Sequence, residues 1–190
     1  MTLSSEMSLL RSSLSCCTYR GDQHTDVHIK EHDTSAKLKS ITLKAANGDW
    51  FSFDPDSGRG RSAVMSPLLS TAVGHSHNRA CDCVVLVRSG EKLTAIYIDL
   101  KSSSPSGYAG QFKSTRQFVR YVLGLLSEFH NCSLVISEER FVVLHTGRPA
   151  SINKTTTVPK AKNLSQTQPD RPYKREVLTS SSIYLRELLT

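Results

Sequence analysis

Two apolar runs joined by a short polar connection constrain this fold most. Residues 81–87 read CDCVVLV and residues 93–100 read LTAIYIDL, with RSGEK between them. Runs of this length and composition predict strands, and the short polar connection predicts a β-hairpin. The density of apolar residues indicates that the hairpin is buried on both faces. A central sheet inside the molecule is therefore expected.

Three charged residues interrupt these two runs. Asp82 lies in the first run, and Asp99 and Lys101 lie two residues apart at the end of the second, so both point to one face of a strand. If the loop spans residues 89–92, the pairing places Asp82 directly opposite Asp99. Side chains in such a pair lie ~4.5–5.5 Å apart, which is close enough for two carboxylates to share a divalent ion. A shift of one residue would separate them.

Carboxylates inside a protein need a compensating cation, because burying their charge costs several kcal/mol. Mg²⁺ or Mn²⁺ takes oxygen ligands and leaves positions for water and phosphate. Such an ion would polarise a phosphate and lower the pKa of an attacking water, and Lys101 would stabilise the developing negative charge. The alternative interpretation is structural, with a surface salt bridge at the acid-x-Lys sequence and a turn cap at Asp82.

The pattern of Asp82 followed by Ile98-Asp99-Leu100-Lys101 resembles the PD-(D/E)XK nuclease superfamily. The resemblance implies an α/β fold with a mixed central sheet flanked by helices, a restriction-endonuclease-like core. The implied order is a helix, strands, the two motif strands, a long helix and another strand. It also implies that Asp82 and Asp99 bind Mg²⁺ and that Lys101 is the catalytic lysine. Small members of this superfamily often serve DNA repair, restriction or defence.

Further site residues follow from the same resemblance. Some subfamilies have a glutamine on the next helix, and Gln111 matches it, although Thr115 stands where a tyrosine often follows. Some members bind the metal through a glutamate on the first helix, for which Glu6 is the candidate and Glu31 another.

Charge and spacing favour a nucleic-acid partner. The net charge of +7 attracts polyanions. Lys113, Arg116 and Arg120 recur on one side of a predicted helix, where they would hold phosphates or form an ordinary solvated face. The sequence thus predicts a Mg²⁺-dependent nuclease of DNA or RNA. The alternative is a catalytically inactive nuclease-like module that binds nucleic acid or protein, in a homodimer or a larger complex.

The whole sequence is expected to divide into two parts. Residues 1–148 form a nuclease-like domain, and residues 149–190 form a basic Ser/Thr/Pro-rich tail with a short helix near its end. Within the domain we expect a first helix at residues 2–17, capped by Ser4 or Ser5, a loop or short helix at 20–37, and a hairpin around Asn47-Gly48 at 41–53. A short buried helix at 63–73, a long helix at 110–129, and one or two more strands at 134–144 should follow.

Histidines and cysteines offer weaker metal patterns. His75, His77, Cys81 and Cys83 are zinc-ligand types, but their spacing matches no common module and the cysteines are expected in the core. His24, His28 and His32 would share a face only on a helix. Five cysteines without a C-x-x-C motif favour reduced thiols and a cytoplasmic location. We expect no signal peptide and no membrane span, because no apolar run is long enough.

Overall fold

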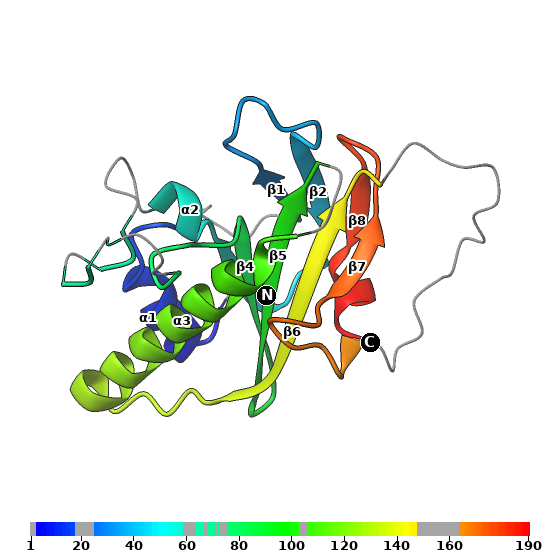
Figure 1. The fold of residues 1–190 in the computed structure, drawn as a ribbon. Coiled ribbons are helices and arrows are strands. Elements are labelled where there is room, and N and C mark those ends of the chain that lie inside the picture. The colour runs from blue at the N-terminus through cyan, green and yellow to red at the C-terminus, as the bar shows by residue number, and fades with distance from the viewer. Residues whose placement is uncertain are drawn as a thin grey trace.

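The structure is a computed structural model, and it describes residues 3–17, 25–58, 64–66, 68–70, 72, 76–102, 106–147 and 164–190. The fold is mixed α/β, with two mixed sheets and few helices among these residues (Figure 1). The elements in chain order are α1 (Ser5–Ser12), β1 (Asp26–Lys30), β2 (Ser40–Lys44), β3 (Asp49–Phe53), α2 (Pro55–Gly58), β4 (Cys83–Ser89), β5 (Lys92–Lys101), α3 (Tyr108–His130), β6 (Ile136–His145), β7 (Tyr173–Glu176), β8 (Ser182–Tyr184) and the 3-10 helix η2 (Leu185–Leu188).

The larger sheet has the strand order β3-β4-β5-β6-β7. Its first three strands are antiparallel neighbours, whereas β5, β6 and β7 run parallel. The predicted hairpin is β4–β5, and Arg88 pairs with Leu93 as expected. This register matters for function because it fixes which side chains meet at the end of the hairpin.

The fold has three layers, with one hydrophobic core between the helices and the larger sheet and a second core between the two sheets. Side chains of α1 and α3 pack on one face of the larger sheet, while β1, β2 and β8 pack on the other. Helices therefore cover one face, and the smaller sheet, of order β1-β2-β8, covers the face where helices were also expected. The apolar face of α3 is wide, as predicted, and each buried Leu or Phe stabilises the fold by ~1.5–3 kcal/mol. No described helix is long and apolar enough to cross a membrane.

The predicted hairpin around Asn47-Gly48 is wrong, although both of its strands exist. β2 pairs with β1 and β8 in the smaller sheet, while β3 pairs with β4 in the larger one. The connection takes the chain from one sheet to the other, and the indole N–H of Trp50 fixes it by donating to the carbonyl oxygen of Ala46 at 2.8 Å. Trp50 lies in the core between the two sheets.

Two other local predictions are corrected. Residues 26–30 form strand β1 rather than a loop or short helix, because Val27 and Ile29 alternate with exposed neighbours and are buried. The expected buried helix at 63–73 lies partly outside the described residues, and within them Leu68 is 91% exposed. The first helix is shorter than expected, but Ser4 caps it as predicted.

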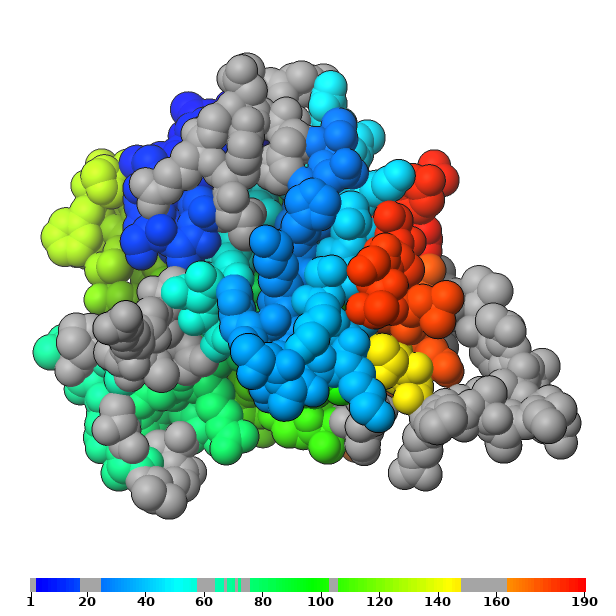
Figure 2. All heavy atoms as spheres, turned by 90° about the horizontal axis from the view of Figure 1, so that it is seen from above, coloured from blue at the N-terminus to red at the C-terminus, as the bar shows by residue number. Residues whose placement is uncertain are grey.

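Residues 164–190 are part of the fold rather than a tail. β7 adds a strand to the larger sheet beside β6, and β8 adds one to the smaller sheet beside β2. Figure 2 shows this C-terminal segment, in red and orange, against the blue segment that contains β1 and β2. The expected terminal helix is the 3-10 turn η2, and Leu188 in it is fully buried. The scattered apolar residues of this segment supply one edge of the core between the sheets.

Candidate functional site

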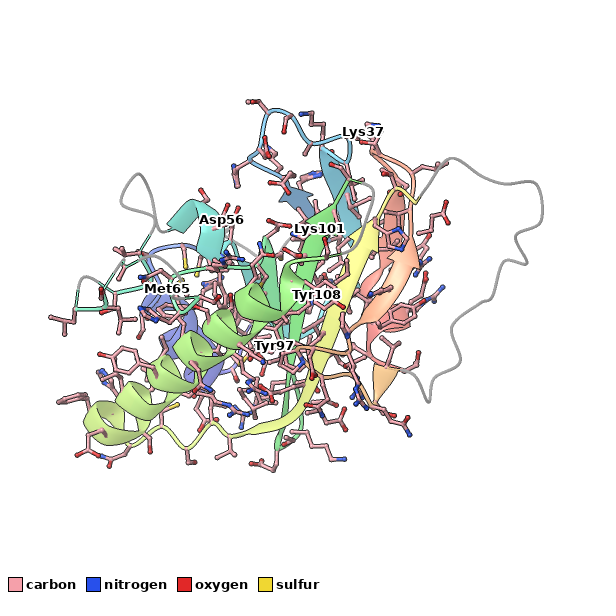
Figure 3. All side chains as sticks on the ribbon, viewed as in Figure 1. Lys37, Asp56, Met65, Tyr97, Lys101 and Tyr108 are labelled. Carbon is pink, nitrogen blue, oxygen red and sulfur yellow. The ribbon has the colours of Figure 1, made fainter. Side chains whose placement is uncertain are left out.

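Three charged side chains meet where the β4–β5 hairpin ends. The β4–β5 pairing ends at Cys83 and Ile98, and Asp82 and Asp99 are the next residues of the two segments. Asp99 and Lys101 alternate with Ile98 and Leu100, which pack between the two sheets. Asp99 and Lys101 therefore face the side covered by α3. Figure 3 labels Lys101 at this end of β5.

The Asp82 carboxylate is almost completely buried. Its Oδ2 atom accepts a hydrogen bond from the backbone N–H of Leu100 at 2.5 Å, which ties the start of β4 to the end of β5. Burial raises the pKa of Asp82 well above its ordinary value, and the neighbouring charge of Asp99 raises it further.

Asp99 is fully buried with little compensation. Its Oδ2 atom lies 2.6 Å from Nζ of Lys101, as a charge-assisted ion pair, whereas its Oδ1 atom accepts no hydrogen bond from the described residues. Burial raises the pKa of Asp99 to about 6, although Lys101 opposes this. The negative charges of Glu31 and Asp56 raise it as well, so both carboxylates lie near this end of the hairpin.

Asp82 and Asp99 are carboxylates, the ligand type that hard divalent cations take. Lys101 supplies positive charge to Oδ2 of Asp99, and Oδ1 of Asp99 accepts no hydrogen bond from the described residues. Mg²⁺ is commonly held by one or two carboxylates together with waters and substrate phosphates. Among the described residues there is no group of three or more His, Cys, Asp or Glu side chains that could hold a metal. Asp82 and Asp99 are thus the available pair.

The structure separates Glu6 from this pair. Glu6 forms an ion pair with Arg88, and Arg88 is six residues along the strand direction from Asp82, roughly 20 Å at strand geometry. Glu6 therefore does not reach the carboxylate pair, and its charge stabilises the packing of α1 on β4. Glu31 is near enough to raise the pKa values of both aspartates, yet it forms no three-ligand group with them.

Gln111 lies beside the site but contacts the backbone. Its Nε2 donates to the carbonyl oxygen of Ala80 at 3.0 Å, two residues before Asp82. Thr115, one turn later, accepts the N–H of Cys81 through Oγ1 at 3.1 Å. The two side chains hold the segment that carries Asp82 against α3. The sequence did not predict this role, because Thr115 was considered only as the residue that stands where a tyrosine often follows the glutamine.

Two of the three residues in the predicted basic stripe on α3 form ion pairs within the protein. Arg116 and Arg120 turn toward Glu139 on β6, at 4.0 and 3.0 Å. The hydroxyl of Tyr97 also donates to Glu139, at 3.3 Å. These two arginines therefore have a structural partner. Lys113, two turns before Arg120 on α3, lines an apolar cavity of about 500 Å³.

The zinc pattern has no support among the described residues. The Cys81 thiol donates to the carbonyl oxygen of Cys83 at 3.5 Å, and burial raises the pKa of both thiols. His77 bonds to the carbonyl oxygen of Ser70, and His75 lies outside the described residues.

The other histidines do not share a helical face. His28 lies on β1 and bonds to Thr42, whereas His24 lies outside the described residues. His32 forms a pair with Asp54 at 2.9 Å, and this hydrogen bond raises the pKa of His32.

Comparisons with protein-family models, with curated proteins and with solved structures found no match to this chain.

Proposed function

We propose that this chain is a metal-dependent nuclease that hydrolyses phosphodiester bonds of DNA or RNA. The observation that carries the proposal is Asp99, a fully buried carboxylate beside Asp82 that is paired with Lys101 through Oδ2 and whose Oδ1 atom accepts no hydrogen bond from the described residues. The order α1, β3, β4, β5, α3, β6 also follows the order that the nuclease resemblance implies. The same resemblance extends the proposal to repair or defence.

Each site residue has a distinct role in this proposal. Asp82 and Asp99 would bind Mg²⁺ or Mn²⁺, which when bound would polarise the phosphate and acidify a water molecule. Lys101 is held on the same side of β5 by its ion pair with Asp99. Its ammonium group would stabilise the extra negative charge that the phosphate acquires in the transition state. Gln111 is a positioning residue, since it holds the backbone just before Asp82.

The direct test is cleavage of plasmid DNA, single-stranded DNA and RNA with Mg²⁺ or Mn²⁺, compared with EDTA. Asp99→Asn and Lys101→Met should each lower the rate by roughly 10²–10³, the usual effect of removing one group that stabilises the transition state. Asp170→Asn is the matched control, because Asp170 is exposed and lies outside the site. Cleavage that survives both site substitutions would exclude this mechanism.

A second candidate is a nuclease-like module that binds nucleic acid or protein without cutting it. It is favoured by the lack of a three-ligand group among the described side chains. Calorimetry separates the two functions. Mg²⁺ or Mn²⁺ binding that disappears in Asp82→Asn supports the enzyme, whereas nucleic-acid affinity without metal binding supports the module.

A further inference from the structure

A lysine from the C-terminal segment lies in the same row of the sheet as Asp99. Asp99 pairs with Val143 on β6, and Val143 pairs with Lys174 on β7. Directly paired residues of neighbouring strands point to the same face. Lys174 therefore faces the α3 side, two strands from Asp99. At ~4.8 Å per strand, their backbones are separated by roughly 10 Å.

An aromatic ring holds the Lys174 side chain in place. Nζ of Lys174 lies 4.9 Å from the centroid of the Tyr108 ring. Tyr108 is the first residue of α3, and its ring also packs near Phe112 in the core, with centroids 6.1 Å apart. Figure 3 labels Tyr108 on α3 and Lys101 near the end of β5. A cation is attracted to the face of an aromatic ring, so this contact favours one position of the Lys174 ammonium group above the Tyr108 ring.

The charge of Lys174 remains available to a ligand. Lys174 is exposed, and none of the described carboxylates forms an ion pair with it. The other lysine of this face, Lys101, is already paired with Asp99. In contrast to Arg116 and Arg120, which contact Glu139, Lys174 thus presents an uncompensated cation beside the candidate site.

We propose that Lys174, held by Tyr108, binds a backbone phosphate of the nucleic-acid strand that enters the Asp82–Asp99 site. This inference rests on the proposed function and extends it by naming where the substrate is gripped. A separation of roughly 10 Å between the two backbone positions places the bound phosphate close to the one that is cut. This contact would fix the strand without determining its sequence.

The test measures binding of a fluorescein-labelled single-stranded oligonucleotide to the full chain in EDTA. Fluorescence anisotropy gives the affinity at salt concentrations between about 50 and 200 mM. Lys174→Ala should weaken binding about five- to tenfold at the lower salt concentration. It should also reduce the slope of log affinity against log salt by about one, the signature of one lost phosphate contact. Lys92→Ala is the matched control, because Lys92 is exposed at the opposite end of β5.

The tyrosine is tested through ring and hydroxyl separately. Tyr108→Phe keeps the ring and should leave the affinity unchanged, whereas Tyr108→Leu should weaken it and should add nothing in a Lys174→Ala background. Melting temperatures of all variants verify that they fold.

The outcomes separate this inference from the proposed nuclease activity. Equal affinities and salt slopes for Lys174→Ala and Lys92→Ala would overturn the inference, even if Asp99-dependent cleavage is found. Failure of the wild-type chain to bind the oligonucleotide would overturn it as well. A Lys174-dependent slope in a chain that never cuts would support the phosphate contact and refute the enzymatic function alone.

Discussion

At the scale of single residues, Asp99 is a buried carboxylate whose charge lowers the stability of the fold. Its side chain is withdrawn from water, and Lys101 compensates only part of the cost, so its pKa rises to about 6. Asp82 opposite has a raised pKa for the same reason, with the charge of Asp99 as the second cause. Without a bound cation, the pair therefore keeps its protons to higher pH than ordinary aspartates do.

The raised pKa of Asp99 predicts how stability changes with pH. A group that binds its proton more tightly when folded stabilises the folded state at low pH, and this contribution is lost as pH rises through the folded pKa. Between the ordinary value of 3.8 and about 6, the unfolding free energy should therefore fall relative to Asp99→Asn, by roughly 3 kcal/mol in total. Urea unfolding of both proteins in EDTA from pH 4 to 7 measures it, and a constant difference would contradict it.

Metal binding should release protons, because both carboxylates must ionise to act as ligands. Affinity for Mg²⁺ or Mn²⁺ is expected to rise with pH between 5 and 7, through the pKa of about 6 for Asp99. Calorimetry in two buffers with different ionisation enthalpies counts the released protons. A binding enthalpy that is the same in both buffers would show that the ligands are already ionised.

At the scale of elements, the C-terminal segment stabilises the fold through few residues. Ile183 on β8 and Leu188 on η2 are buried in the core between the sheets, whereas Leu178 is 78% exposed. Ile183→Ala and Leu188→Ala should each lower the unfolding free energy by about 2–4 kcal/mol, through lost burial and the cavity left behind. Leu178→Ala is the control and should change it by less than about 0.5 kcal/mol. Urea unfolding measures all three, and equal effects would mean that this segment is not packed.

The elements that could be predicted are those specified by local sequence. The β4–β5 hairpin and α3 have long apolar patterns, so their positions, and with them the register of Asp82 and Asp99, follow from neighbouring residues. β1 has two apolar residues among five, and β7, with the sequence YKRE, has none of the expected alternation of apolar residues. These short strands are formed by pairing with distant parts of the chain, which no local pattern specifies.

The candidate site divides in the same way. Asp82, Asp99 and Lys101 belong to the two arms of one hairpin. Their relative positions could therefore be predicted by counting residues from its loop. Glu6 was misplaced because α1 packs at the other end of β4, against Arg88. Lys174 was missed because it reaches the row of Asp99 through two parallel pairings, β5 with β6 and β6 with β7, each between strands far apart in sequence.

At the scale of the whole molecule, the C-terminal segment connects the two sheets. Its strand β7 lies in one sheet and β8 in the other, and the shared core between them contains Trp50. Trp50 is the one tryptophan of the chain. Its fluorescence should therefore report the separation of the sheets, while far-UV circular dichroism reports the loss of strands and helices.

The two signals should follow one transition. Because the core between the sheets is continuous, we expect unfolding curves from Trp50 fluorescence and circular dichroism to coincide in urea, as for a single cooperative unit. Two separated midpoints would show that the smaller sheet unfolds independently. Ile183→Ala should move both curves together to lower urea concentrations.

The side chains on the two faces of β7 contact different parts of the molecule. Tyr173 and Arg175 face the smaller sheet, where Tyr173 packs against the core and Arg175 pairs with Glu187 at 2.5 Å. Lys174 faces outward beside α3. The proposed phosphate contact and the stability of the fold should therefore be separable within four consecutive residues, by exchanging side chains on one side of the strand while leaving the other unchanged.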